Sequence, residues 1–212
     1  MNKELFQLIE YAKNELNNNA KGELTLSIRR KIYKLMGEYK RDSEKHALIS
    51  DGFIRRLKLA RLSVEYVLHI WEEAAPEDKT PIELLNSIDL YIDGKIDWDS
   101  LWSMKNSFWT VVENYSVEDR FLVAAYVGFA SIKATSTALF DENEEIEVDD
   151  EGNELLDEDL DPYTWDTAFY SSLAYSEYNS ESEDAAIEKK REFWRWYLNV
   201  AVPTAYEIIK DK

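Results

Sequence analysis

Apolar residues recur every three or four positions through most of this chain, the spacing of one face of an α-helix. A short stripe near the start predicts a first helix over residues 4–17, with Leu5, Ile9, Ala12 and Leu16 on one face. A longer stripe begins after Asp51 and consists of Phe53, Leu57, Ala60, Val64, Val67, Leu68 and Trp71. Both stripes predict helices that bury one face against a core.

Capping residues divide the rest of the pattern into further helices. Thr80 with Pro81 and Glu83 has the spacing of a capping box, and Gly94 is placed to end the helix that follows. Further helices are expected to begin at Asp97, Ser116 and Asp161. Residues 121–138 are apolar nearly all round, which predicts a central helix surrounded by others. A final helix from about Asp184 is expected to kink or break at Pro203.

Domain organisation follows from these elements. No internal repeat and no change of composition marks a boundary, and 212 residues that are 45% hydrophobic are enough for one substantial core. The sequence predicts a single all-α domain over residues 1–212, a helical bundle of about seven or eight helices. A loop or hairpin insertion is expected at 141–161, where Ile146 and Val148 alternate with acids before Leu155 returns.

The same insertion holds most of the excess negative charge. It carries 13 acids and no base, while the formal net charge of the chain is -18, which leaves about -5 for all other residues. Such a field attracts cations or a basic partner and repels nucleic acid. Residues 21–61 are basic instead, with 12 bases against five acids. These bases are expected to form a solvated face that also pairs with the acidic half of the chain.

The usual catalytic constellations are missing from the sequence. The chain has no Cys, and neither His46 nor His69 follows a Glu by three residues, which excludes the paired Glu-x-x-His pattern of di-iron bundles. Neither a Gly-rich phosphate loop nor a Gly-x-Ser-x-Gly elbow is present. Residues 147–158 overlap the spacing of an EF-hand, but Glu147 stands where Asp is wanted and Glu154 where an apolar residue is wanted. We therefore expect no enzyme activity, no cofactor and no metal site.

Localisation is predicted from the absence of a signal peptide and of a membrane-spanning run in the sequence. Residues 1–18 form an amphipathic stretch without the apolar core or cleavage site of a signal peptide. The longest uncharged apolar run, 121–132, has about 12 residues, against the roughly 20 that a membrane span needs. The absence of Cys also fits a reducing compartment. A cytoplasmic protein with no membrane partner is expected.

Two aromatic groups in the last third of the chain admit two interpretations. The first group is Trp165, Phe169 and Tyr170, and the second is Phe193, Trp194, Trp196 and Tyr197. Aromatic residues at helical spacing are usually core. The second group, however, spans nearly all directions around a helix, so some of its rings must face another element or solvent, which favours a contact surface.

Three stretches resemble the fifth-numbered family of bacterial immunity proteins. They are Trp71-Glu72-Glu73 with Pro76-Glu77-Asp78 and Pro81, the run DPYTWDTAFY at 161–170, and REFWRWYL at 191–198 followed by VPTA at 202–205. The resemblance covers roughly residues 53–205 and implies a mostly all-α protein encoded beside a toxin, without catalytic activity or cofactor. It implies one partner, the cognate toxin domain, which is bound and neutralised in the cell that makes it.

The toxin is expected to meet the acidic segment and the start of the helix after it, where charge not needed for folding is concentrated. Charge complementarity accelerates encounter and penalises wrong partners. The predicted contact residues are Glu144, Glu145, Glu147, Asp149, Asp150, Glu151, Asp157, Glu158, Asp159, Asp161, Tyr163 and Asp166. Trp165, Phe169, Phe193 and Trp194 are expected to hold the supporting helices together.

Two alternative functions stay open on the sequence alone. One is a small-ligand protein or metal-dependent helical enzyme that uses carboxylates in a cleft, for which the sequence offers no motif. The other is a self-associating scaffold in which the basic early half of one copy meets the acidic late half of another. The sequence leaves the oligomeric state and the identity of the toxin open.

Overall fold

A computed structural model describes residues 1–141 and 155–207 of the chain, and most of this part is helical. Its helices are α1 (Lys3–Asn18), α2 (Leu26–Leu35), α3 (Asp51–Ala74), α4 (Thr80–Ile92), α5 (Trp98–Ser116), α6 (Leu122–Phe140), α7 (Thr167–Glu177), α8 (Glu183–Trp196) and α9 (Val202–Glu207). Short 3₁₀ turns are η1 (Asp119–Phe121), η2 (Asp157–Asp159) and η3 (Pro162–Thr164).

The helix count and class agree with the prediction. The π-helical segment η4 (Tyr197–Ala201) joins α8 to α9 without a break, so the described residues contain eight separate helices. Apart from an isolated bridge between Arg41 and Ala47, they contain no strand. The all-α fold is therefore confirmed. The small hairpin expected from Ile146 onward falls on 142–154, outside the described residues.

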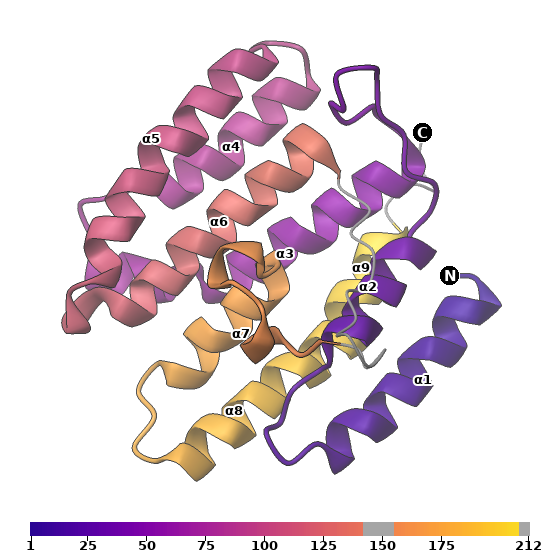
Figure 1. Cartoon of the computed structure of the whole chain (residues 1–212), viewed down its shortest axis with the longest axis vertical. Coiled ribbons are helices and arrows are strands. Elements are labelled where there is room, and N and C mark those ends of the chain that lie inside the picture. The colour runs from indigo at the N-terminus through magenta and orange to yellow at the C-terminus, as the bar shows by residue number, and fades with distance from the viewer. Residues whose placement is uncertain (142–154, 208–212) are drawn as a thin grey trace.

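Helix α6 occupies the centre of the bundle (Figure 1). It packs against α3, α5, α7 and α4, and buried side chains lie on all its faces, which confirms the expected central helix. Within the described residues, Asp119–Phe140 is the one helix long and apolar enough to cross a membrane by length and composition. Because 67% of its most apolar window is buried inside the bundle, it has the burial of a core helix.

A glycine allows the closest approach to α6. A Cβ atom on Gly128 would lie 2.5 Å from a methyl group of Val112 on α5 and 3.1 Å from the ring of Trp71 on α3. Real Cβ contacts essentially never come within 3.0 Å, so a larger residue would push the helices apart. The small residue at 128 therefore sets the distance at which α5 packs on α6.

Some predicted helix ends are right and others are wrong. Asp97 caps α5 by accepting the N–H of Ser100, and Gly94 ends α4 with φ of 68°. Thr80, however, is the first residue of α4 rather than its cap, and Ser116 is the last residue of α5 rather than the start of α6. Asp161 caps only the short turn η3. Helix α7 begins six residues later at Thr167, capped by Asp166, whose carboxylate accepts the N–H of Phe169.

The last helix is continuous through Pro203. Proline lacks the N–H that would donate to the carbonyl four residues earlier in an α-helix. The wider π-helical turn directly before Pro203 accommodates this loss without ending the helix. The sequence predicted a kink or a break at Pro203. The break does not occur, and the α-helical pattern is interrupted instead by the π-helical segment just before Pro203. Phe193, Trp194 and Tyr197 are fully buried, because α7 packs on one side of α8 and α1 on another. Trp196 is partly buried and stacks on Tyr66, so the rings that span the helix meet neighbouring elements and not an open contact surface.

Candidate functional site

A buried arginine holds the first residue of the acidic segment. Arg56 on α3 binds Asp141 with both arms of its guanidinium, Nε at 2.6 Å from Oδ1 and Nη2 at 2.5 Å from Oδ2. Both side chains are almost completely buried, at 0% and 1% exposure. Arg56 also donates to the carbonyls of Gly37 and Glu38, and it lies over the ring of Tyr39. We call this group the first clamp.

Glycines bring the backbone at residues 37–38 within reach of Arg56. Gly37 has φ of 139°, a conformation that favours glycine. A Cβ atom on Gly52 would lie 2.7 Å from the carbonyl carbon of Gly37 and from the carbonyl oxygen of Glu38. The start of α3 and this loop therefore touch backbone to backbone, which places two carbonyls beside the Arg56 guanidinium one turn further along α3.

A second buried arginine holds the acidic segment near its end. Arg29 on α2 binds both carboxylate oxygens of Asp157 through its two Nη atoms, and its Nε donates to Asp166 at 2.7 Å. Nη1 also donates to the carbonyl of Leu24, and the guanidinium packs on the rings of Phe169 and Trp194. We call this group the second clamp. The two clamps together fix both ends of the acidic segment to the helical body.

The electrostatics of the second clamp follow from its burial. Burial alone would lower the pKa of Arg29, but Asp166 and Asp157 outweigh it and raise that pKa, so the guanidinium stays charged. Burial raises the pKa of Asp157, with Arg29 opposing the rise. Removing one partner of such a pair would leave an uncompensated buried charge. The expectation that charge in this segment is unneeded for folding is therefore wrong for Asp157, which is 5% exposed.

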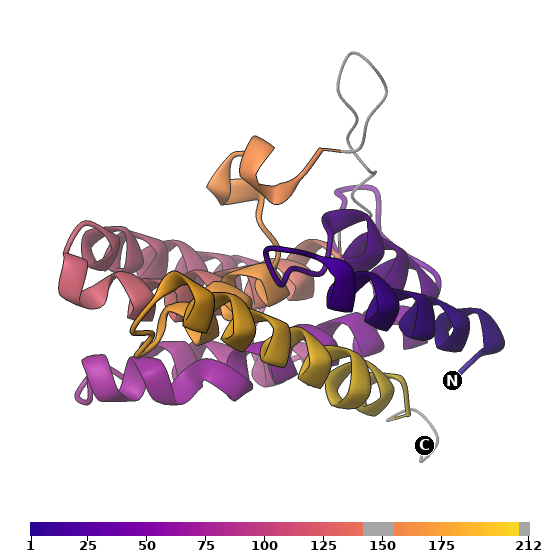
Figure 2. The same ribbon diagram turned by 90° about the horizontal axis from the view of Figure 1, so that it is seen from below.

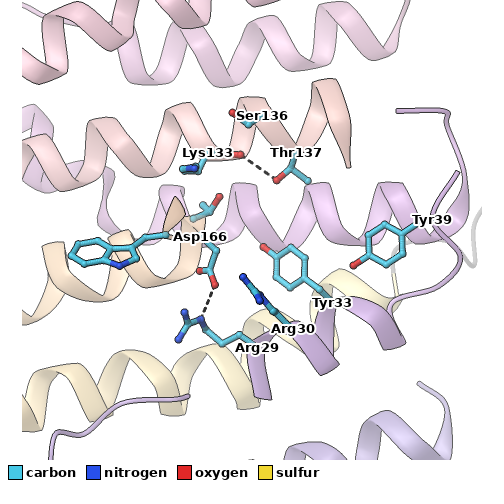
Figure 3. Close-up of a pocket in the computed structure, with 10 residues that line it drawn as sticks. Arg29, Arg30, Tyr33, Tyr39, Lys133, Ser136, Thr137 and Asp166 are labelled. Atoms are coloured by element: carbon cyan, nitrogen blue, oxygen red, sulfur yellow. Dashed lines mark hydrogen bonds and ion pairs between the residues drawn. The ribbon is translucent and has the colours of Figure 1, made fainter. Parts of the chain in front are cut away.

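A pocket of about 100 Å³, lined mainly by polar residues, lies between α2, α6 and the start of α7 (Figure 3). Helix α2 contributes Arg29, Arg30 and Tyr33, and Figure 3 shows the Arg30 side chain between Asp166 and Tyr33. The rest of its wall consists of Tyr39, Lys133, Ser136, Thr137, Trp165, Asp166 and Thr167. The pocket thus adjoins both clamps, because Arg29 and Asp166 belong to the second and Tyr39 packs under Arg56 of the first.

Hydroxyl groups deepen the polar character of this region. Burial raises the pKa of Tyr33 well above its ordinary value, and Asp166 and Tyr39 raise it further. The pKa of Tyr197 is raised in the same way by burial, Tyr33 and Asp166. Both side chains therefore remain neutral hydroxyls that can donate hydrogen bonds. The Tyr197 hydroxyl is fully buried and has no hydrogen-bond partner among the described groups.

The remaining described acids of the predicted contact surface lie outside the clamps. Glu158 pairs with Lys21, and both side chains are 57% exposed. The Asp159 carboxylate accepts the N–H of Leu156, and that of Asp161 accepts the N–H of Tyr163. Figure 2 shows this stretch, drawn in orange, raised above one face of the helices. Glu158, Asp159 and Asp161 are exposed on that face.

Tyr163 and Trp165 connect this raised stretch to the bundle. Tyr163 is half exposed, packs on Trp109 of α5, and its carbonyl accepts a hydrogen bond from Lys133 at 2.5 Å. Trp165 is partly buried, donates from Nε1 to the carbonyl of Asp157 and packs edge-on against Phe169. The turns η2 and η3 are thus held by aromatic contacts as well as by the second clamp.

Several predicted contact residues lie in the part of the chain that the structure does not describe. They are Glu144, Glu145, Glu147, Asp149, Asp150 and Glu151. The EF-hand-like spacing at 147–158 falls mainly on the same residues. Among the residues that are described, no group of three His, Cys, Asp or Glu side chains is arranged to hold a metal ion.

Sequence reasoning missed both clamp arginines, although a signal for them exists. Arg56 stands three residues after Phe53 and four before Ala60, so it lies on the apolar stripe of α3. Arg29 stands three residues from both Leu26 and Ile32 on α2, on the buried face of that helix. A base on an apolar stripe must find a buried carboxylate or carbonyl partner.

The family model described as immunity protein Imm5 matches residues 9–204. Its span includes both clamps, the pocket and the whole acidic segment. No curated protein matches the chain.

Proposed function

Because the chain belongs to the Imm5 family of immunity proteins, we propose that it protects the cell that makes it by binding a cognate toxin domain in the cytoplasm. Neutralisation by binding, without catalysis or a cofactor, is supported by a sequence that has no Cys and no phosphate-binding loop. The partner is a protein, and its contact face is basic. The observation that carries the proposal is an acidic segment whose two ends are fixed by buried clamps in a chain of this family.

The clamps bear on binding because a held segment loses less conformational freedom when it meets a partner. Ordering a flexible surface on binding costs free energy, and fixing it beforehand reduces that cost. The first clamp holds Asp141 and the second holds Asp157, so the acids between them start and end at defined points on the body. Their charge raises the rate of encounter with a basic surface.

The test is the association rate with the toxin domain encoded beside this chain. One variant neutralises five acids outside the clamps: Asp149→Asn, Asp150→Asn, Glu151→Gln, Glu158→Gln and Asp159→Asn. We expect association at low salt to slow by about tenfold or more, and its dependence on salt to flatten. Asp157 is left intact because it is buried and binds Arg29.

A matched control separates position from net charge. It neutralises five exposed acids elsewhere on the protein, Glu15, Glu72, Glu77, Asp99 and Glu183, and so changes the net charge by the same amount. We expect this control to associate nearly as fast as the parent. If association slowed equally in both variants, the acidic segment would have no specific role in binding and would serve solubility only. Absence of binding by the parent protein would refute neutralisation by direct contact.

A further inference from the structure

We propose that the exposed ring of Tyr163 receives one Arg or Lys side chain of the toxin, beside the carboxylates of Glu113 and Asp161. This inference rests on the proposed function and extends its contact face from the acidic segment onto α5. It names a chemical group of the partner, a single guanidinium or ammonium that meets an aromatic ring. We call Tyr163, Trp109, Glu113 and Asp161 the aromatic site.

Tyr163 is held in place by contacts of its ring and of its backbone. The ring packs on Trp109 of α5, with 5.3 Å between the ring centroids. Trp109 in turn packs edge-on against Phe129 of the buried core. The Tyr163 N–H donates to the Asp161 carboxylate, and its carbonyl accepts a hydrogen bond from Lys133 on α6. The ring therefore has a defined position on the helical body.

The same ring is open to a partner. The Tyr163 side chain is 50% exposed, and it belongs to the turn η3 in the stretch that Figure 2 shows raised above the helices. A side chain that is already held loses little conformational freedom when a partner covers it. Tyr and Trp are also enriched among the residues that supply most of the binding energy of protein interfaces. Tyr163 thus has the exposure and the support of a contact residue.

Two carboxylates make this ring suitable for a cation. The Tyr163 hydroxyl donates to Oε1 of Glu113 at 3.3 Å. Glu113 raises the pKa of Tyr163 more than burial does, and Asp161 raises it further, so both charges act on the hydroxyl end of the ring. A carboxylate offers about four acceptor positions, so each acid can hold Tyr163 and bind a base as well. A cation over a tyrosine ring is attracted by the ring itself.

The charges around the ring disfavour other occupants. An apolar side chain of the toxin would take Glu113 and Asp161 out of water without pairing them, which costs free energy. An anion would be repelled by these acids and by the acidic segment, which ends at Asp161. Lys133 adds one positive charge next to Tyr163, and this does not balance the two acids. A basic side chain is therefore the group that the aromatic site fits.

The aromatic site and the acidic segment should act on different rates. The charge of the segment acts over a distance and raises the rate of encounter. A cation on a ring is a contact that exists only in the finished complex, so its loss mainly raises the dissociation rate. This difference separates the two elements in a kinetic experiment.

The experiment uses the full chain, the neighbouring toxin domain and two substitutions at one position. Tyr163→Leu keeps an apolar side chain on Trp109 but removes the ring, and Tyr163→Phe keeps the ring but removes the hydroxyl. We expect Tyr163→Leu to raise the dissociation rate about tenfold, with the association rate nearly unchanged. Tyr163→Phe should stay within about twofold of the parent, because phenylalanine also binds cations with its ring face.

Tyr11→Leu is the matched control. Tyr11 is 54% exposed and lies on α1, which Figure 1 shows on the opposite side of the molecule from α5. The control makes the same chemical change at nearly the same exposure, and both of its rates should equal those of the parent. Thermal unfolding of all three variants at the temperature of the parent would show that the kinetic effect is not misfolding.

A double-mutant scan then identifies the toxin group. Each Lys and Arg of the toxin domain is changed to Met and measured against the parent and Tyr163→Leu. We expect one toxin base whose loss weakens binding to the parent about tenfold but has little further effect in Tyr163→Leu. The same base should couple to Glu113→Gln, which removes a charge but leaves the ring in place. This second coupling tests the site even if Tyr163→Leu is unstable.

Each other outcome has a definite meaning. Tight toxin binding by the parent with equal dissociation of Tyr163→Leu and Tyr11→Leu would overturn the aromatic site and leave the proposed function standing. Equal losses in Tyr163→Phe and Tyr163→Leu would assign the contact to the hydroxyl and overturn the ring as the recognising group. Coupling of Tyr163 to an uncharged toxin residue would overturn the cation. Failure of the parent to bind the toxin would remove both proposals.

Discussion

Arg29 and Arg56 have the same charge and burial but different numbers of acidic partners. A buried guanidinium is costly unless carboxylates and carbonyls satisfy its donors. Arg56 has one carboxylate, Asp141, and backbone oxygens at Gly37 and Glu38. Arg29 has two carboxylates, Asp157 and Asp166. The first clamp therefore depends on a single acid, whereas the second keeps one acid if the other is lost.

This difference predicts unequal effects of neutralising the clamp acids. Asp141→Asn keeps the size of the side chain and tolerates the left-handed backbone at φ of 43°, so it isolates the loss of charge. We expect it to lower the free energy of unfolding by about 3 kcal/mol, the lower end for a broken buried pair. Asp157→Asn should cost less, because Asp166 still balances Arg29. Chemical denaturation of both variants measures the difference.

Glu77→Gln serves as the control for these two variants. Glu77 is exposed and follows Pro76 between α3 and α4, so its neutralisation should change stability by no more than about 0.5 kcal/mol. A loss in Asp141→Asn as small as in this control would mean that water, and not burial, surrounds the first clamp.

Buried tyrosines make the protein sensitive to alkaline pH. Burial raises the pKa of Tyr66 to about 12, and raises those of Tyr33, Tyr170 and Tyr197 as well. Above the unfolded value of about 10, the folded state holds protons that the unfolded state has lost, so the free energy of unfolding falls as pH rises. Absorbance near 295 nm measures tyrosine ionisation, and far-UV circular dichroism measures helix content. We expect one group of tyrosines to ionise only at the pH at which helix is lost. Ionisation of all the tyrosines before any loss of helix would contradict this.

Helices α5 and α6 meet at a contact that has no spare room. Gly128 faces Val112 so closely that a single methyl group would overlap it. We expect Gly128→Ala to destabilise the protein by about 1 to 3 kcal/mol through overpacking, although alanine is intrinsically the better helix former. The midpoint and slope of urea unfolding measure this loss.

A second substitution tests whether the overlap is the cause. Val112→Ala removes both methyl groups that approach Gly128, so the double variant Gly128→Ala with Val112→Ala should be scarcely less stable than Val112→Ala alone. Additive losses in the double variant would show that Gly128 acts through something other than contact with α5.

Helix identities could be predicted from the sequence more accurately than helix ends. Helices α1 and α3 could be predicted because burial of one face leaves an apolar residue every three or four positions. Helix α6 could be predicted because burial of all faces leaves it apolar nearly all round. Ends failed where several residues could serve as the cap. At α4 the carboxylate of Asp78 accepts the N–H of Thr80, so a residue outside the helix satisfies one of its first N–H groups. At Ser116 the hydroxyl donates to a carbonyl in α5 and does not open a new helix.

The candidate site could be located from the sequence but not built from it. Thirteen acids within 21 residues identify the acidic segment from the sequence alone. The clamps join residues 85 and 128 positions apart, and one sequence carries no signal for pairing at that distance. A base on an apolar stripe shows that a buried partner must exist, but the partner becomes known only when the helices are placed. The pocket depends on the same placement.

Opposite charges in the two halves of the chain meet within a single molecule. Arg29 and Arg56 from the basic half bind Asp157 and Asp141 from the acidic half. Lys21 pairs with Glu158 at the surface in the same sense. A head-to-tail scaffold would need these groups to be available to another copy, and the two buried pairs are not. The basic and acidic halves of the sequence therefore form ion pairs within the folded chain.

We expect the purified protein to remain a monomer at low salt as well as at high salt. Association through the basic and acidic halves would be electrostatic, so it would be strongest at low ionic strength and lost as salt shortens the range of charge interactions. Gel filtration with light scattering across protein concentration, at about 20 mM and about 500 mM salt, measures the mass directly. A dimer or larger species that forms at low salt and dissociates at high salt would favour the scaffold. A constant mass near 24.9 kDa would show that the acidic segment does not bind a second copy, which favours a different protein as its partner.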